Sequence, residues 1–365
     1  MEGGELSKAT LADQPMDCCF HPSANLLAGA VITGRVECFR FEGENTHRVF
    51  DLKAHSDSCR AVRFTTDGAL LLSASADCSI LATDSATGAA ASRLEHAHGC
   101  GVNTLECIDA AVLASGDDDG VIKLWDVRQR EAIGTFETHG DFISDFTYSP
   151  DNNSLVASSG DGSISVYDLG TRKLIAQSED DADDELLSVA VLKNGKKVVC
   201  GSQEGVVFIY SWGYFNDCSD RFPGHPNSID ALVKFDEDTI ITGSSDGLIR
   251  ILNILPNKML GVVGEHDEYP IECLALSGDK KLLASASHDN TIKLWDINYL
   301  HDTDDAEDGA EDVPEGAGDD GSDMSDSDDD AKSKAKAEKT RMKGKGKGKG
   351  SKGAGAGPNF FQDML

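Results

Sequence analysis

Histidine, serine and aspartate residues recur along this chain in groups that could, by residue type, hydrolyse a bond. In a Ser-His-Asp triad the Asp orients the His, and the His takes the proton of the Ser hydroxyl. Two groups have these types: His98, Ser115 and Asp119, and His266, Ser285 and Asp289. A hydrolase needs one such group, whereas this chain repeats it at a regular period. We therefore predict a structural role for both groups and no catalytic residue.

Metal and cofactor chemistry has weaker support. His96, His98 and Cys100 carry zinc-ligating atoms, but no second ligand pair lies at a recognised spacing, so we predict no metal site. The Lys-Gly run near Lys345 does not fit the phosphate-binding pattern GxxxxGK[ST]. We expect no cofactor and no small-molecule substrate. No apolar run approaches the ~20 residues that span a bilayer, so we expect no membrane partner.

The elements that position these residues form a sevenfold repeat. Successive units end in similar pairs, which lie 42 to 44 residues apart, within the ~40–45-residue period of four-stranded propeller blades. Each pair is aromatic-acidic or a degenerate version of that: Phe39-Arg40, Thr83-Asp84, Trp125-Asp126, Tyr167-Asp168, Tyr210-Ser211, Leu252-Asn253 and Trp295-Asp296.

Each unit has the pattern of a blade. The pair Asp119-Gly120 is a hairpin signal, and β-favouring residues from Val121 to Leu124 follow it. One small sheet cannot bury both faces, so neighbouring blades must cover it. We predict an all-β fold, a seven-bladed β-propeller over residues 15–300. An N-terminal arm, residues 1–14, should close the ring by supplying the last blade's outer strand.

This repeat resembles the WD-repeat family over roughly residues 5–300. The resemblance implies that a His, a Ser or Thr, a turn Asp and a Trp form a buried hydrogen-bonded chain in each complete blade. The complete sets would be His98, Ser115, Asp119 and Trp125, and His266, Ser285, Asp289 and Trp295. Partial sets are His55, Ser73 and Asp77, and His225, Thr242 and Asp246, with Thr83 and Leu252 at the Trp positions.

Several stretches outside the repeat consensus resemble the family of WD repeat-containing protein 55. The strongest runs from Asn253 to Asn257, where a turn with Pro256 replaces Trp-Asp, and continues from Gly261 to His266. The resemblance implies a nuclear and nucleolar protein that binds other proteins and supports ribosomal RNA production and ribosome assembly.

A second resemblance lies within the third unit. Leu113 to Arg128 is similar to the box by which some WD-repeat proteins dock on the adaptor of cullin 4 RING ubiquitin ligases. Strand alternation would bury Trp125 and Val127 and turn Asp126 and Arg128 outward, so that Arg128 offers a cation at the rim. Alternatively, polar residues follow Trp-Asp only because a turn begins there.

The charge balance favours basic protein partners. The chain has 64 acidic and 33 basic residues, a net charge of -31. Residues 301–365 hold 17 acids and 10 bases, which leaves 47 acids against 23 bases in the predicted propeller. Such a surface suits Lys/Arg-rich ribosome-assembly factors and repels bare nucleic acid. The ten cysteines include no CxxC pair, as expected of reduced thiols in the nucleus or cytosol.

The tail has segregated charge. We predict disorder for the acidic segment 301–331 and a Lys/Gly-rich segment over 332–365. Lys343, Lys345, Lys347 and Lys349 favour nuclear or nucleolar targeting, with loose RNA contact through phosphates as a further hypothesis. Ser322, Ser325 and Ser327 lie among acids and are candidate phosphosites. The terminal Phe360-Phe361 pair suggests a docking motif, although chance apolar residues would look the same.

Three classes of function follow. The first is a non-enzymatic scaffold for ribosome-assembly proteins, and the second is a substrate receptor of the cullin 4 ligase. An enzyme would require carboxylates or His in the central channel that the repeat does not explain. The sequence shows us no such set.

Overall fold

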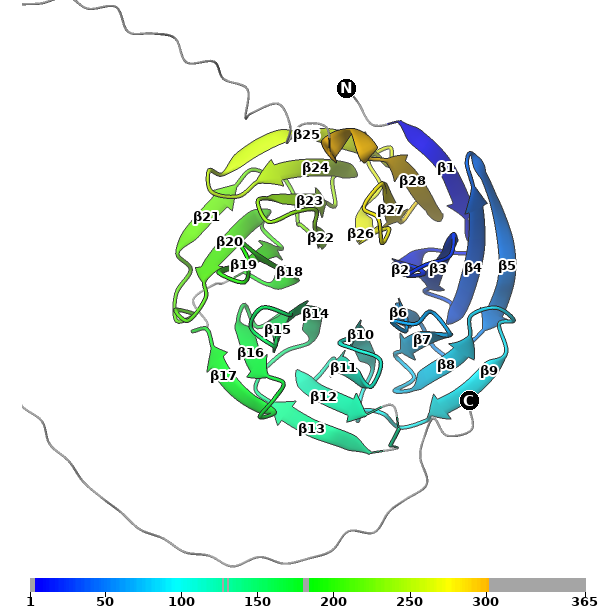
Figure 1. The fold of residues 1–365 in the computed structure, drawn as a ribbon, viewed down its shortest axis with the longest axis horizontal. Helices are drawn as coiled ribbons and strands as arrows, with labels where there is room; N and C mark the ends of the chain where they lie inside the picture. Colours follow the sequence, from blue (N-terminus) through cyan, green and yellow to red (C-terminus); the bar gives the residue numbers. More distant parts are fainter. Residues whose placement is uncertain (1–3, 127, 130, 180–183, 302–365) are drawn as a thin grey trace, which may run out of the picture. The chain divides into compact units, whose positions relative to one another are not determined.

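The computed structural model describes residues 4–126, 128–129, 131–179 and 184–301. Within them, 28 strands form seven four-stranded antiparallel sheets around a central axis (Figure 1). This confirms the predicted seven-bladed propeller. The tail segments predicted from 301 onward lie outside the described residues, apart from His301.

The strands of the first three blades follow one another along the chain. Blade 1 contains β2 (Pro15–Phe20), β3 (Leu26–Val31), β4 (Arg35–Glu42) and β5 (Asn45–Lys53). Blade 2 contains β6 (Cys59–Phe64), β7 (Leu70–Ser75), β8 (Ile80–Asp84) and β9 (Ala90–Leu94). Blade 3 contains β10 (Val102–Cys107), β11 (Val112–Asp117), β12 (Val121–Asp126) and β13 (Ala132–Glu137).

The remaining blades continue this order until the last. Blade 4 contains β14 (Ile143–Ser149), β15 (Ser154–Ser159), β16 (Ile164–Asp168) and β17 (Lys173–Gln177). Blade 5 contains β18 (Leu186–Leu192), β19 (Lys197–Ser202), β20 (Val206–Ser211) and β21 (Asp220–Pro223). Blade 6 contains β22 (Ala231–Lys234), β23 (Thr239–Gly243), β24 (Leu248–Asn253) and β25 (Lys258–Glu265). Blade 7 contains β26 (Ile271–Leu276), β27 (Leu282–Ser287), β28 (Thr291–Asp296) and β1 (Glu5–Thr10).

Burial follows the position of a strand within its blade. The second strands are buried along almost their whole length, as in β15, because both faces of each blade pack against a neighbour. Val156 and Ile164 of blade 4, for example, share one apolar cluster with Val189 and Val198 of blade 5. Every residue of the outer strand β5 is exposed or half-buried. The core therefore consists of layers between blades.

The N-terminal strand closes the ring. β1 pairs antiparallel with β28, with Ala9 opposite Ile292 and Lys8 opposite Lys293. Ala9 is buried in a cluster that joins residues of blade 7 to residues of blade 1. The first and last blades are thus held together by a strand from the opposite end of the chain, and the inner strands β2 and β26 also contact each other.

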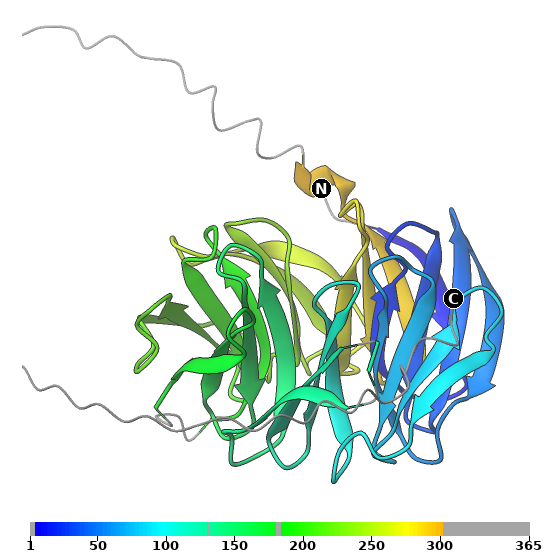
Figure 2. The same cartoon turned by 60° about the horizontal axis from the view of Figure 1, so that its bottom comes forward.

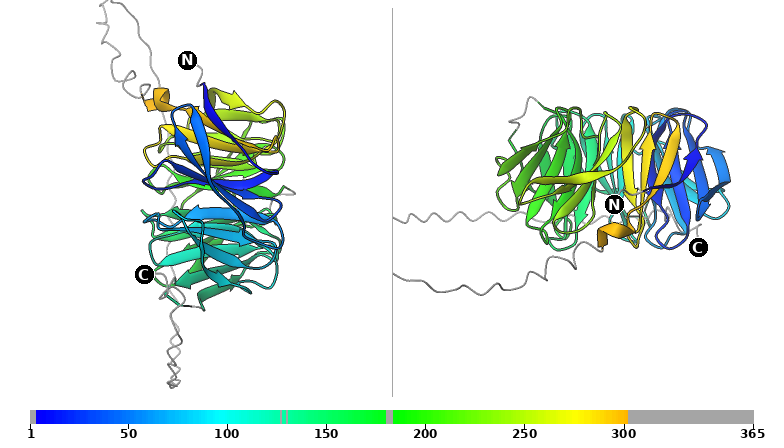
Figure 3. Two further views of the ribbon diagram at one scale, coloured as in Figure 1. Left: turned by 90° about the vertical axis from the view of Figure 1, so that its right-hand side faces the viewer. Right: turned by 90° about the horizontal axis from the view of Figure 1, so that it is seen from above.

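The connections gather on two faces of the ring (Figures 2 and 3). Because every blade is an antiparallel meander, links between its first two and last two strands lie at one end of the strands. We call this the lower face. Links between the middle strands, and from blade to blade, lie on the upper face. Gly120 turns one upper link with φ of 77°, and a Cβ there would lie 2.6 Å from the His139 carbonyl oxygen.

The described chain ends on the lower face in a 3₁₀ turn over residues 298–301. There, the His301 ring lies 5.0 Å from the ring of Phe235 in blade 6. The described residues contain no helix with the length and apolarity that a bilayer span demands.

Candidate functional site

The hydrogen-bond set of blade 7 runs from a Trp to an Asp. Trp295 Nε1 donates to Ser285 Oγ at 2.8 Å, and Ser285 Oγ lies 2.6 Å from His266 Nε2. His266 Nδ1 lies 2.8 Å from Asp289 Oδ2. The Nδ1–H group donates a hydrogen bond to Asp289, so Nε2 is left to accept a hydrogen bond from the Ser285 hydroxyl. Ser285 and His266 are fully buried, so no substrate reaches this hydroxyl and the set serves the fold.

The set of blade 3 differs from the prediction at its acid. Trp125 Nε1 donates to Ser115 Oγ at 2.8 Å, and Ser115 Oγ lies 2.6 Å from His98 Nε2. The partner of His98 Nδ1 is Asp117, at 2.7 Å, and not Asp119. Asp117 stands at the end of β11 with its side chain pointing inward, whereas Asp119 is exposed in the turn. The assignment of Asp119 was therefore wrong: blade 3 has a second acid two residues earlier, and that acid is the buried one.

Blade 4 holds a set that the sequence analysis missed. His139 Nδ1 lies 3.1 Å from Asp161 Oδ2, and His139 Nε2 lies 2.6 Å from Ser165 Oγ. Ala157 stands where other blades have the Ser or Thr, and Ser165 on the next strand replaces it. The spacing could have revealed this set, because His139 precedes Asp161 by 22 residues, as His55 precedes Asp77.

In the two partial sets, blades 2 and 6, an Arg bonds near the turn Asp, at the opposite end of the set from the missing Trp. Arg93 Nη1 donates to Ser79 Oγ at 2.8 Å, and Ser79 Oγ lies 3.0 Å from His55 Nδ1. In blade 6, Arg250 donates two hydrogen bonds to Asp246, at 2.9 and 2.5 Å. In blade 6 the predicted bond between His225 and Asp246 is absent: His225 Nε2 lies 2.9 Å from Thr242 Oγ1, but the buried His225 Nδ1 has no hydrogen-bond partner among the described residues.

The proposed ligase contact at the rim of blade 3 is an ion pair within one turn. Arg128 Nε and Nη2 donate to the two Asp126 carboxylate oxygens at 2.8 and 2.6 Å. The Arg128 side chain is 69% exposed, but that of Asp126 is only 8% exposed. Asp126 therefore does not point outward as predicted. Its carboxylate holds the Arg128 guanidinium in one orientation through two hydrogen bonds. The hydrogen bonds from Arg128 lower the pKa of Asp126 to about 2. Val127 lies outside the described residues.

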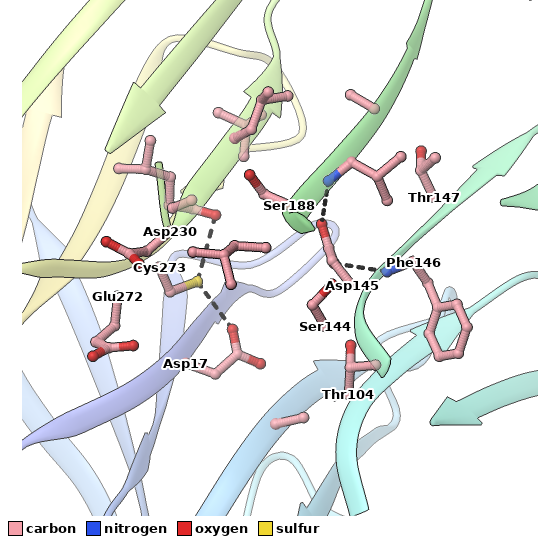
Figure 4. A pocket seen from close by; sticks show the side chains of 18 of the residues that line it. Asp17, Thr104, Ser144, Asp145, Phe146, Thr147, Ser188, Asp230, Glu272 and Cys273 are labelled. Atoms are coloured by element: carbon pink, nitrogen blue, oxygen red, sulfur yellow. Dashed lines mark hydrogen bonds between the residues drawn. The ribbon is translucent and has the colours of Figure 1, made fainter. Parts of the chain in front are cut away.

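The innermost strands surround a cavity of about 450 Å³ on the ring axis (Figure 4). Its lining includes the acids Asp17, Asp145, Asp230 and Glu272, which come from four different blades. These four acids were not identified from the sequence, in which we saw no channel set of carboxylates or His beyond what the repeat explains. The residue pairs that mark each unit stand on the third strands, whereas Asp17, Asp145 and Glu272 stand on first strands and Asp230 directly precedes one.

Two of these acids link neighbouring blades by accepting backbone hydrogen bonds. Asp17 accepts the Cys18 and Val62 backbone N–H groups at 2.8 Å each, and Val62 belongs to the next blade. Asp145 accepts the Phe146 and Val189 N–H groups at 2.8 and 3.0 Å in the same manner. Figure 4 shows Asp145 between these strands. Repeated contacts of this kind explain why an acid stands at this position without any catalytic role.

The cavity lining also includes the cationic side chains Arg60, Arg63 and Lys234. Arg63 Nη1 lies 2.5 Å from Asp17 Oδ2, and Arg63 Nε lies 3.8 Å from Glu106 Oε2. Burial raises the pKa of Glu106 to about 7, although Arg63 opposes this shift. Burial likewise raises the pKa of Asp145 to about 6. Burial thus disfavours the charged forms of these two acids, and the nearby Arg63 offsets only part of that effect. No group of metal-ligating side chains occurs among the residues that the structure describes.

The charges on the connections are polarised between the two faces. None of the described residues in the fourteen upper-face links is Lys or Arg. Exposed acids occur in seven of these fourteen links: Asp57, Glu95, Asp119, Asp141, Glu185, Glu204, Asp267 and Glu268. The lower-face links contain both signs, including Arg128, Arg172, Lys193 and Lys280. The upper face is therefore a broad acidic surface around the channel mouth.

The seven meander sheets, the closing strand and the repeated His-to-Trp hydrogen bonds define a WD-repeat β-propeller. A sequence profile of the WDR55 family matches residues 7–300. The chain therefore belongs to the WDR55 family.

Related proteins from distant organisms are similar over most of the chain. WD repeat-containing protein 55 of Arabidopsis thaliana is 50% identical over 283 residues, which cover 77% of this chain and 80% of the plant protein. The protein of that name from Bos taurus is 41% identical, over 77% of this chain and 74% of its own. WD repeat-containing protein JIP5 of Coprinopsis cinerea is 37% identical, over 80% and 74%.

Proposed function

We propose that this protein is a non-catalytic scaffold whose upper face binds basic proteins, and that it works in the nucleus and nucleolus in ribosomal RNA production and ribosome assembly. The observation that carries the binding mode is the upper face, where exposed acids surround the channel mouth and the links lack Lys and Arg. Ribosome-assembly factors dense in Lys and Arg are complementary to such a surface.

The non-catalytic part of the proposal rests on the partners of the chemistry-bearing residues. The buried Ser hydroxyls are hydrogen-bonded to His and Trp, and two channel acids bind backbone N–H groups of adjacent blades. A nucleophile or a general base would have to give up these bonds to react. We therefore assign the groups to the fold and leave recognition to the surfaces.

Two charge variants of equal size test the binding face. The upper-face variant combines Asp119→Asn, Glu204→Gln, Asp267→Asn and Glu268→Gln, whereas the lower-face control combines Glu44→Gln, Glu131→Gln, Asp151→Asn and Asp217→Asn. All eight side chains are exposed. Each variant removes four negative charges, so a general charge effect is the same in both. After affinity purification from nuclei, we expect only the upper-face variant to lose Lys/Arg-rich assembly factors. Equal recovery by both variants would refute the proposal.

A second function is favoured by the rim of blade 3, namely docking on the cullin 4 ligase adaptor. Asp126 holds the exposed Arg128 through two of its five guanidinium N–H groups, which leaves three for an acceptor on another protein. Arg128 lies on the lower face, so this docking and the binding of basic partners could occur together.

Substitution of Arg128 tests this second function. Arg128→Ala should abolish adaptor capture and lower the thermal midpoint only slightly, because the Asp126 carboxylate keeps its bonds from the backbone N–H of residue 128 and from Gln129 Nε2. Arg172→Ala on the neighbouring blade is a matched control, since Arg172 is also exposed on the lower face. Undiminished adaptor capture by Arg128→Ala would eliminate the contact.

The tail contributes localisation in this proposal. Lys343, Lys345, Lys347 and Lys349, and the phosphosite candidates Ser322, Ser325 and Ser327, lie outside the described residues. We propose that the lysines hold the protein in the nucleolus and contact RNA loosely through phosphates. Such contact would weaken steeply with salt, and deletion of residues 332–352 would abolish it. Salt-independent RNA binding, or binding that survives the deletion, would contradict this role.

A further inference from the structure

The outer strand of blade 6 is an uncharged, apolar edge. From Met259 to Gly264 the strand β25 carries no charged residue, and charges stand only at its ends, Lys258 and Glu265. Met259, Leu260 and Val262 are 37%, 52% and 43% exposed. β25 pairs with β24 on one side and is the last strand of its sheet. Long apolar edge strands are normally protected by charge or by another strand.

Bulges explain how this surface arises. Leu252 pairs with Met259, and Ile251 pairs with Gly261, so Leu260 is an extra residue that the ladder turns outward. A second bulge makes Val263 the extra residue, and this side chain is buried toward blade 7. The exposed Leu255 precedes the strand. We use the name β25 strip for the four exposed apolar residues of β25 and the link before it: Leu255, Met259, Leu260 and Val262.

One segment of this chain has matching chemistry. After His301 the large apolar residues are Val313, Met324 and Met342, followed by Phe360, Phe361, Met364 and Leu365. More than half of them therefore stand in the last six residues. The terminal segment, residues 359–365, contains a single charged side chain, Asp363. It can add to an edge strand without bringing repulsive charges.

The chain also leaves the propeller close to this strand. Leu300 packs in the same apolar cluster as Val263 of β25, and the His301 ring lies against Phe235 of blade 6. The 57 residues 302–358 separate His301 from the terminal segment. A flexible chain of that length has a root-mean-square span of roughly 40 Å, and eight strand residues cover about 26 Å. The segment can therefore reach the whole strip at high effective concentration.

We propose that the terminal segment, residues 359–365, docks along β25 of the same molecule as an added edge strand. Backbone hydrogen bonds to the open edge would fix the segment, and the two Phe side chains would cover the β25 strip. This role is separate from the binding of basic partners on the upper face.

Hydrogen exchange of the full chain tests this docking. We compare the wild type, a chain ending at Gly357, and the double variant Phe360→Ser with Phe361→Ser. Amides of residues 258–265 should exchange at least tenfold faster in both altered chains. A synthetic peptide of residues 357–365, added to the truncated chain, should restore the slow exchange. Equal exchange in all three chains would overturn the proposal.

A matched substitution locates the docking site. Leu260→Asp should speed exchange of the terminal amides 360–365 themselves, which a local disturbance of β25 would not do. Ile175→Asp is the control, since Ile175 is 53% exposed on the outer strand β17, and it should leave those amides unchanged. Terminal amides that respond equally to both substitutions would contradict docking on β25. Protection that rises with protein concentration would show docking between molecules and refute the intramolecular contact.

Discussion

At the scale of single residues, the clearest departure from the repeat pattern is Asp117, the acid that contacts His98. Asp117 lies 2.7 Å from His98 Nδ1 and also accepts the Val121 N–H group at 2.8 Å. Burial opposes its ionisation, but these hydrogen bonds prevail and lower the pKa of Asp117. Asp117→Ala should lower the free energy of unfolding by about 2–4 kcal/mol, because it leaves the His98 Nδ1–H and the Val121 N–H without their acceptor. Asp119→Ala should change it by less than about 0.5 kcal/mol. Urea unfolding of the two variants checks this, and equal losses would return the role to Asp119.

Glu106 in the channel should make stability depend on pH. Its folded pKa of about 7 lies above the ordinary Glu value because of burial. A raised carboxyl pKa gives stability that is complete below the unfolded pKa, near 4.3, and is lost as pH rises through 7. Glu106→Gln should therefore stabilise the protein at pH 8, by about 2 kcal/mol or less, and have little effect near pH 4. Thermal unfolding across this range measures the effect. A destabilised variant at pH 8 would show that the contact with Arg63 outweighs burial.

At the scale of elements, we expect the N-terminal strand β1 to be necessary for closing the ring. Ala9 on β1 is 3% exposed and packs against residues of blades 1 and 7. Ala9→Asp should release β1, because an unpaired charge cannot be buried in this cluster, and should cost more than about 3 kcal/mol. Thr10→Asp, at an exposed position on the same strand, is the control. Hydrogen exchange of β28 should rise only in Ala9→Asp. Unchanged exchange there would mean that the ring closes without β1.

The sequence predicted the blades well because their signals are local and repeated seven times. The Asp-Gly turns and the pairs such as Trp295-Asp296 mark each third strand, and closure leaves β1 one place to pair. What it could not predict depends on contacts between blades. Asp17 accepts a hydrogen bond from the Val62 N–H of the next blade. Asp117, and not Asp119, contacts His98 because its side chain points inward. Neither choice is encoded in the spacing within one unit. The bulge that exposes Leu260 likewise appears only in the pairing register.

At the scale of the whole molecule, charge is sorted by topology. In a meander blade, alternate links fall on opposite faces, so a sequence that keeps Lys and Arg out of every second link produces one acidic face. Long-range attraction to this face would speed the encounter with basic partners and weaken as salt rises. The lower face, with its mixed charges, is left for contacts of defined geometry such as that of Arg128.

The most direct test of this account is to map where basic partners touch the propeller. Complexes captured from nuclei would be treated with a reagent that couples carboxylates to amines without a spacer, and the joined peptides identified by mass spectrometry. We predict that partner lysines are joined to upper-face acids such as Asp57, Asp119 and Glu204. Lysines joined mainly to lower-face acids such as Glu44, Glu131 and Asp151 would contradict the account.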